Sequence, residues 1–244
     1  MINKFITRYL YSSVHISIIA GIYCVLVSNQ KDALKDFGLG FLTTFIYYNI
    51  SRIIRIKDYD KTKNNPHLFW ISNNLTELIF ALGFSVLILL IWINFSIYSN
   101  MVYGFALGVI YILFRKIIFI KNILISIAWY LLPILYTDMS VHVNRDMIFR
   151  LCFFLFLSLW YDLKDKEYNE LLLKKGESFY YTLLFGLLGC NTALFYSQTN
   201  VLKAILFFIL FYIGIIYVKK INKYLVYMFV IDCLILAPFI IKML

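Results

Sequence analysis

A stretch of the sequence that begins at Asp162 could bind a cation and an anionic ligand together. Asp162, Asp165 and Asn169 stand at positions i, i+3 and i+7, so a helix running through them would place all three on one face. Mg²⁺ takes oxygen ligands of this kind, keeps several waters and commonly shares its remaining ligands with a phosphate group. The nearby Lys164 could help to neutralise a diphosphate. The alternative is a solvated, mixed-charge loop that ends a helix.

A second polar stretch follows an apolar segment that ends near Asn49. Asn49 and Arg52 lie about one helical turn apart, and Asp60 comes roughly three turns after Asn49 if the helix continues. The three side chains could therefore face the same way. The alternative for this stretch is a basic cluster that flanks a membrane segment.

The elements that must position these residues are membrane helices. The chain has 244 residues, of which 62% are hydrophobic and 15% charged, and its mean hydropathy is +0.81. A soluble domain is nearer half apolar and a quarter charged. Lipid offers the backbone no hydrogen bonds, so long apolar runs are expected to be helical. We therefore predict an all-α, polytopic membrane protein with a single domain covering residues 1–244.

Nine segments approach the length of a membrane crossing, which is about 20 apolar residues with roughly 17–25 tolerated. They are Tyr9–Val27, Leu34–Ile54, Leu75–Phe95, Tyr98–Phe114, Ile120–Tyr136, Met147–Tyr161, Phe179–Tyr196, Val201–Val218 and Tyr224–Ile241. The sequence thus predicts a nine-helix transmembrane bundle. Its two longest charged connections contain the two polar stretches.

The lysines and arginines give this bundle a direction. With the N-terminus in the cytoplasm, 17 of the 23 basic residues fall on the cytoplasmic side, as is usual for membrane proteins. The other six are Lys31, Lys35, Arg145, Arg150, Lys203 and Lys242. Both polar stretches then lie at the cytoplasmic face. The net charge of +10 is explained without nucleic acid, so the expected surroundings are membrane lipids.

This arrangement resembles the UbiA superfamily of membrane prenyltransferases, which includes 4-hydroxybenzoate polyprenyltransferase. That family has nine helices, with polar cytoplasmic motifs after the second and sixth. Asp162, Asp165 and Asn169 fall on the second motif, Asp-x-x-Asp-x-x-x-Asp, with Asn at its last position. Residues 114–129 look like the segment that leads into the family's fifth helix, and residues 230–232 like part of its last helix.

The first motif of the family is altered in this chain. Of its conserved positions only Asn49 matches, and Tyr48-Asn49-x-x-Arg52 looks like the signature of a divergent branch. Asp58 and Asp60 could supply the missing carboxylates from a shifted register.

The resemblance implies an enzyme that transfers an isoprenoid group from a prenyl diphosphate to an acceptor, often aromatic or lipid-like. It implies a Mg²⁺ cofactor and a site at the cytoplasmic face of, we expect, a bacterial cytoplasmic (inner) membrane. The metal ligands it implies are Asp162, Asp165, Asn169, Asp58 and Asp60, and the catalytic residues are Asp162 and Asp165. The diphosphate contacts it implies are Asn49, Arg52, Lys121 and Lys164.

Asp232 is a carboxylate within the last predicted membrane segment. It lies about nine residues inside that segment, roughly 13 Å at the rise of an α-helix. A carboxylate at such a depth is costly and usually faces a polar interior or a partner. Three roles stay open for it, which are to orient a loop lysine or arginine, to line the acceptor pocket, or, as a protonated carboxyl group, to make a structural hydrogen bond between helices.

Two other functional classes stay open. The altered first motif suggests a catalytically inactive relative that binds an isoprenoid or a membrane partner. A small transporter is the third class, although the sequence shows no pair of Gly- or Pro-interrupted helices in matching halves.

Overall fold

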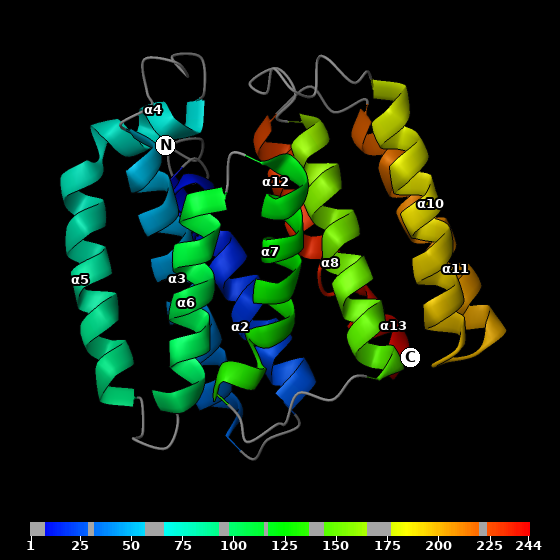
Figure 1. Cartoon of the computed structure of the whole chain (residues 1–244), viewed down its shortest axis with the longest axis horizontal. Helices are drawn as coiled ribbons and strands as arrows, with labels where there is room; N and C mark the ends of the chain where they lie inside the picture. Colours follow the sequence, from blue (N-terminus) through cyan, green and yellow to red (C-terminus); the bar gives the residue numbers. More distant parts are fainter. Residues whose placement is uncertain are drawn as a thin grey trace. The chain divides into compact units, whose positions relative to one another are not determined.

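The computed structural model describes residues 8–28, 32–56, 66–92, 98–114, 117–136, 144–164, 177–219 and 224–244. Every regular element in these ranges is helical, which confirms the predicted all-α class (Figure 1). After a helical turn at residues 8–11 come α2 (Val14–Ser28), α3 (Ala33–Arg55), α4 (Pro66–Asn73), α5 (Leu75–Trp92), α6 (Tyr98–Phe114), α7 (Ile118–Leu131), the 3-10 helix η3 (Ile134–Tyr136), α8 (Arg145–Lys164), α10 (Glu177–Tyr196), α11 (Val201–Lys219), α12 (Tyr224–Leu234) and α13 (Ala237–Met243).

The chain divides into two compact units. Unit 1 comprises Met1–Ile112 with Leu132–Asp138, and unit 2 comprises Leu113–Leu131 with Met139–Leu244. Each unit has buried apolar side chains of its own. The single domain expected from the sequence stays a prediction.

Within the described ranges, three of the predicted membrane segments are interrupted. In Ile120–Tyr136, α7 ends at Leu131 and a turn at residues 132–133 leads into η3. The first segment of the chain breaks at Ser13, which has a positive φ of 66° and separates the turn at residues 8–11 from α2. The last segment breaks after Leu234, where a turn separates α12 from α13, and Pro238 lies in the first turn of α13. Proline has no N–H to donate to the preceding turn, so it belongs at the start of a new helix.

Unit 1 is built on the close packing of α2 against α3. A Cβ atom added to Gly21 of α2 would lie 2.7 Å from the ring of Phe37 and 2.8 Å from its carbonyl oxygen on α3. The two backbones therefore approach too closely for a larger residue. Small residues permit such contacts between membrane helices. A buried cluster of Phe45, Ile71 and Leu78, joined by Leu82, then connects α3 to α4 and α5.

Replacing Gly21 with alanine is expected to lower the free energy of unfolding by about 1–3 kcal/mol, because the added methyl group meets the Phe37 backbone. The matched control is Gly186→Ala in α10, where an added Cβ has nothing within 4 Å. That control should gain up to about 1 kcal/mol from alanine's higher helix propensity. Thermal unfolding in detergent micelles compares the two, and equal effects would refute the close-packing explanation.

Unit 2 packs α8 between α7 and α10, and α11 lies against α10 (Figure 1). Its core is a layer of phenylalanine side chains. Phe207 and Phe211 of α11 have ring centroids 4.6 Å apart, and Phe195 of α10 lies 4.8 Å from Phe207. Phe149 and Phe153 extend the layer onto α8. This layer fixes α8, whose last turn carries Asp162.

Among the residues that the structure describes, two helical segments are long and apolar enough to cross a membrane, namely Leu75–Trp92 and Phe179–Tyr196. Only 17% and 28% of these segments is buried, whereas the core helix of a soluble protein would be mostly buried. On α5 the exposed side chains include Phe80, Phe84 and Ile91. Exposed apolar surface of this kind favours contact with lipid. The full set of nine crossings stays a prediction.

Candidate functional site

The Asp162 carboxylate is the centre of a buried polar cluster in unit 2. Only 3% of this residue is exposed. Its Oδ1 atom forms an ion pair with Nζ of Lys121, and its Oδ2 atom accepts a hydrogen bond of 2.9 Å from Nδ2 of Asn122. The lysine side chain is 19% exposed, so the cluster opens on the lysine side.

The helices bring this cluster together from distant parts of the sequence. Asp162 lies in the last turn of α8, and Lys121 and Asn122 lie in the first turns of α7, which packs against α8. Tyr180, buried near the start of α10, lies within electrostatic reach of the carboxylate. Three helix ends therefore meet around Asp162.

Asn122 has a hydrogen-bonding capacity that its own helix does not use. Its Oδ1 atom is buried and accepts no hydrogen bond from the described residues. A buried acceptor without a donor is costly, and a bound ligand, ion or water commonly satisfies such an atom. Asp162 and Asn122 thus present oxygen atoms of the class that Mg²⁺ takes.

The side chains around Asp162 supply only part of the ligands that a bound Mg²⁺ ion needs. Within the described ranges, no three His, Cys, Asp or Glu side chains are grouped closely enough to hold a metal ion. Asp162 would supply one carboxylate ligand. The other predicted ligands, Asp165, Asn169, Asp58 and Asp60, lie outside the described residues.

The two predicted diphosphate contacts of the first polar stretch belong to unit 1 and form a second buried cluster. Asn49 is fully buried, and its Nδ2 atom donates to the carbonyl oxygens of Ser12 (3.0 Å) and Phe45 (2.8 Å). The hydroxyl of Ser13 donates to Oδ1 of Asn49 at 3.2 Å. The Arg52 guanidinium donates to the same hydroxyl and lies 5.5 Å from the ring centroid of Tyr48.

This second cluster stabilises the helix break at Ser13. The break leaves carbonyl groups without partners in the helix, and Asn49 and Arg52 donate to the carbonyl groups of Ser12 and Tyr11. A positive φ at a residue other than glycine costs energy and persists only where its surroundings hold it. Asn49 and Arg52 therefore have a structural task, and their contact with a diphosphate stays a prediction.

The remaining predicted residues lie in unit 2. Lys164 is the last residue of α8, and its side chain lies outside the described part of the structure. Asp232 is buried in α12, with 7% of its surface exposed. Sequence reasoning did not assign roles to Asn122 or Tyr180, although Asn122 follows Lys121 directly and so shares its end of α7.

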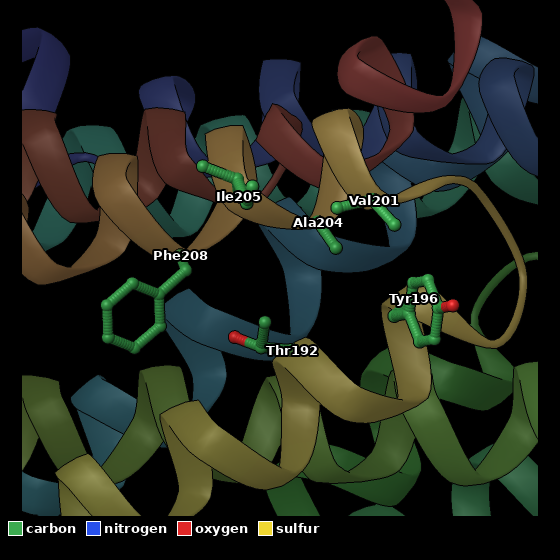
Figure 2. Close-up of a pocket in the computed structure, with 6 residues that line it drawn as sticks. All are labelled: Thr192, Tyr196, Val201, Ala204, Ile205 and Phe208. Atoms are coloured by element: carbon green, nitrogen blue, oxygen red, sulfur yellow. The ribbon is translucent and has the colours of Figure 1, made fainter.

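A shallow apolar groove lies between α10 and α11 at the end of unit 2 opposite to Asp162. Its volume is about 370 Å³ (Figure 2). The lining residues are Thr192, Tyr196, Val201, Ala204, Ile205 and Phe208. Such a surface suits a hydrocarbon chain, and it offers few groups that could take part in chemistry.

No family model matches the chain, and no curated protein or solved structure matches it at a significant level. The residues and their geometry are therefore the basis for assigning a function.

Proposed function

We propose that the chain is a UbiA-like prenyltransferase that crosses a bacterial cytoplasmic membrane with nine helices and has its N-terminus in the cytoplasm. It transfers an isoprenoid group from a prenyl diphosphate to an aromatic or lipid-like acceptor. The observation that supports this best is the buried Asp162 carboxylate, held by Lys121 and Asn122. This cluster stands where the predicted motif of Asp162, Asp165 and Asn169 begins.

The proposed roles follow from the charge of each group. Asp162 supplies an oxygen ligand for the metal, and Asn122 fixes the orientation of its carboxylate. Asp165, Asn169, Asp58 and Asp60 complete the proposed metal ligands. Mg²⁺, when bound, supplies positive charge that stabilises a departing diphosphate.

Lys121 is the proposed cation for the diphosphate at this cluster. Its Nζ atom already lies at the open side of the Asp162 cluster, so it need not be brought there during the reaction. Arg52, Asn49 and Lys164 are the other proposed diphosphate contacts, and Asp232 is a candidate for the acceptor pocket. In the transfer, the bond between the allylic carbon and the diphosphate oxygen breaks and its electron pair leaves with the diphosphate. The same carbon forms a new bond to the acceptor, which gives up a proton.

The test is prenyl transfer by purified protein in detergent or nanodiscs, with a panel of prenyl diphosphates and aromatic and lipid acceptors. We expect transfer with Mg²⁺ and at least about a 100-fold loss in excess EDTA, the scale at which removing a charge-stabilising group affects an enzyme. Transfer that is equally fast in EDTA would contradict the proposed metal role.

The second candidate is an inactive relative that binds isoprenoids, and the Lys121–Asp162 ion pair favours it. A carboxylate that already has a lysine partner does not need a metal for charge balance. This candidate predicts that the protein binds an isoprenoid alcohol and a prenyl diphosphate equally well, and that Mg²⁺ does not change either affinity. The enzyme predicts tighter, Mg²⁺-dependent binding of the diphosphate.

A further inference from the structure

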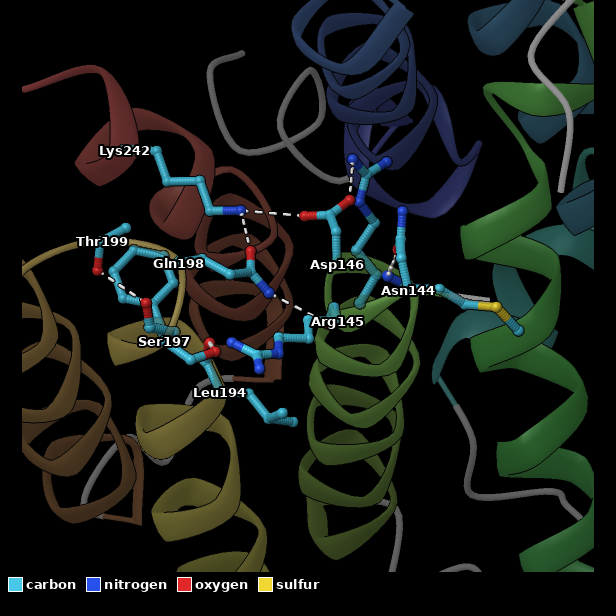
Figure 3. A network of polar contacts seen from close by, with 11 residues as sticks. Asn144, Arg145, Asp146, Leu194, Ser197, Gln198, Thr199 and Lys242 are labelled. Carbon is cyan, nitrogen blue, oxygen red and sulfur yellow. Dashed lines mark hydrogen bonds and ion pairs between the residues drawn. The ribbon is translucent and has the colours of Figure 1, made fainter. Parts of the chain in front are cut away.

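Another charged cluster, distinct from those around Asp162 and Asn49, lies at the end of unit 2 opposite to Asp162. It joins α8, α13 and the turn after α10 (Figure 3). Lys203 of α11 also belongs to it. Nζ of Lys242 lies 3.1 Å from Oδ1 of Asp146 and donates to Oε1 of Gln198 at 2.6 Å. The same carboxylate forms an ion pair with Arg150. Nζ of Lys203 donates to the carbonyl oxygen of Lys242 at 2.9 Å.

The side chains of this cluster carry more positive than negative charge. One carboxylate, that of Asp146, is shared by Arg150 and Lys242. Lys203 is bonded to a neutral carbonyl, and the exposed guanidinium of Arg145 has no ion pair or hydrogen bond within the described ranges. Among the described side chains of this cluster, Arg145, Arg150, Lys203 and Lys242 thus face one aspartate, Asp146.

Two helix N-termini add to the positive potential. α8 begins at Arg145 and α11 begins at Val201. Side-chain oxygens of Asn144 and Asn200 accept from the N–H groups of the first turns, at 2.8 Å and 2.9 Å. Each N-terminus carries roughly half a positive charge. Gathering this much like charge in one place is unfavourable unless an anion compensates it.

We propose that this cluster, through Arg145, Lys203 and the ends of α8 and α11, binds the phosphate headgroup of an anionic phospholipid. All four of its basic residues are among the six that the sequence assigns to the side away from the cytoplasm. They are therefore exceptions to the usual excess of lysine and arginine on the cytoplasmic side of a membrane protein. A headgroup phosphate at that surface supplies the negative charge that the cluster lacks. The adjoining ends of α10 and α11 form the apolar groove, which offers a surface for acyl chains. The proposal rests on the proposed membrane location and not on the prenyl transfer.

The test is a thermal-unfolding titration in a neutral detergent with dioleoyl phosphatidylglycerol, dioleoyl phosphatidylcholine or inorganic phosphate. A ligand that binds only the folded protein raises its melting temperature. We expect a rise with phosphatidylglycerol that exceeds the rise with phosphatidylcholine, and none with phosphate at the same concentration. An equal rise with the two lipids would overturn the proposal, and so would a full effect of phosphate alone.

Matched variants separate charge from folding. Each surface cation contributes roughly a fivefold factor, so Arg145→Gln with Lys203→Gln should weaken apparent phosphatidylglycerol affinity about 30-fold. The control Lys35→Gln removes a cation assigned to the same membrane side but located in unit 1, and should leave affinity unchanged. The charge-conserving pair Arg145→Lys with Lys203→Arg should also bind normally. Equal losses in the control or the charge-conserving pair would refute the assignment.

The prenyl diphosphate affinity of the double variant is the independent readout. It should equal that of the wild-type protein, because Arg145 and Lys203 lie at the opposite end of unit 2 from Asp162. Failure of the lipid titration with intact diphosphate binding overturns this proposal alone. Failure of diphosphate binding with an intact lipid response overturns the proposed function alone.

Discussion

Asp162→Asn should reduce prenyl transfer by at least about 100-fold and lower the free energy of unfolding by about 3 kcal/mol. The first effect follows from losing a charged ligand at the reacting centre. The second follows because Lys121 is left as a mostly buried cation without its carboxylate partner, with its side chain only 19% exposed. Turnover at saturating Mg²⁺ and unfolding in detergent measure the two effects on the same preparation.

The matched control is Asp36→Asn in unit 1. Asp36 is about as buried as Asp162, and its Oδ2 atom accepts a hydrogen bond from Ser28, but nothing connects it with the proposed reaction. Its substitution should lower stability and leave turnover per folded molecule within about twofold of the wild-type value. If both variants lost turnover to the same degree, the special role of Asp162 would be wrong.

A double-mutant cycle separates the ion pair from the catalytic role. Asp162→Asn combined with Lys121→Gln removes both charges, so stability should recover by about 1–3 kcal/mol relative to the single variant. Turnover should not recover, because the metal ligand and the diphosphate contact are both missing. Recovery of turnover in the double variant would show that the single substitution had acted only through folding.

Asn49→Ala is expected to destabilise unit 1 by about 2–4 kcal/mol. The substitution removes three hydrogen bonds, two of them buried and one partly buried, and leaves the Ser12 carbonyl and the Ser13 hydroxyl without this partner. It also removes support for the positive φ of Ser13, a conformation that costs energy by itself. Hydrogen exchange of the amides around Ser13, together with global unfolding, measures the loss.

Asn191→Ala is the comparison for this substitution. Asn191 is also fully buried, but its amide donates only at 2.8 Å to Leu187 within its own helix and at 3.2 Å to Cys152. Its removal should therefore cost less, about 1 kcal/mol. A cost for Asn191 equal to or above that for Asn49 would contradict the structural task assigned to Asn49.

The helix boundaries could be predicted well where apolar runs end at charged or polar residues. The prediction of Tyr98–Phe114 coincides with α6, and Leu34–Ile54 differs from α3 by one residue at each end. The break near Pro238 has a visible cause in the sequence. The break at Ser13 has none, because Ser and Val are compatible with a helix, and it depends on Asn49 and Arg52 from another helix.

The types of residue in the candidate site could be predicted from the sequence. Which of these residues would pair with each other could not. Asp162 and Lys121 were both predicted, but 41 positions separate them, and only the packing of α7 on α8 makes them an ion pair. Asn122 and Tyr180 carry no motif that marks them. Their importance follows from burial beside Asp162, which depends on the tertiary fold and has no local signal in the sequence.

The most direct test of the central claim is the binding of geranylgeranyl diphosphate to the purified protein by isothermal titration calorimetry, because it requires no knowledge of the acceptor. The titration is run with Mg²⁺ and with EDTA, on the wild-type protein and on Asp162→Asn. We expect the wild-type protein to bind the diphosphate with Mg²⁺, and we expect this binding to weaken at least about tenfold, or 1.4 kcal/mol, in EDTA and in the variant. Equal affinity under all these conditions, or no binding to the wild-type protein, would contradict the proposed function.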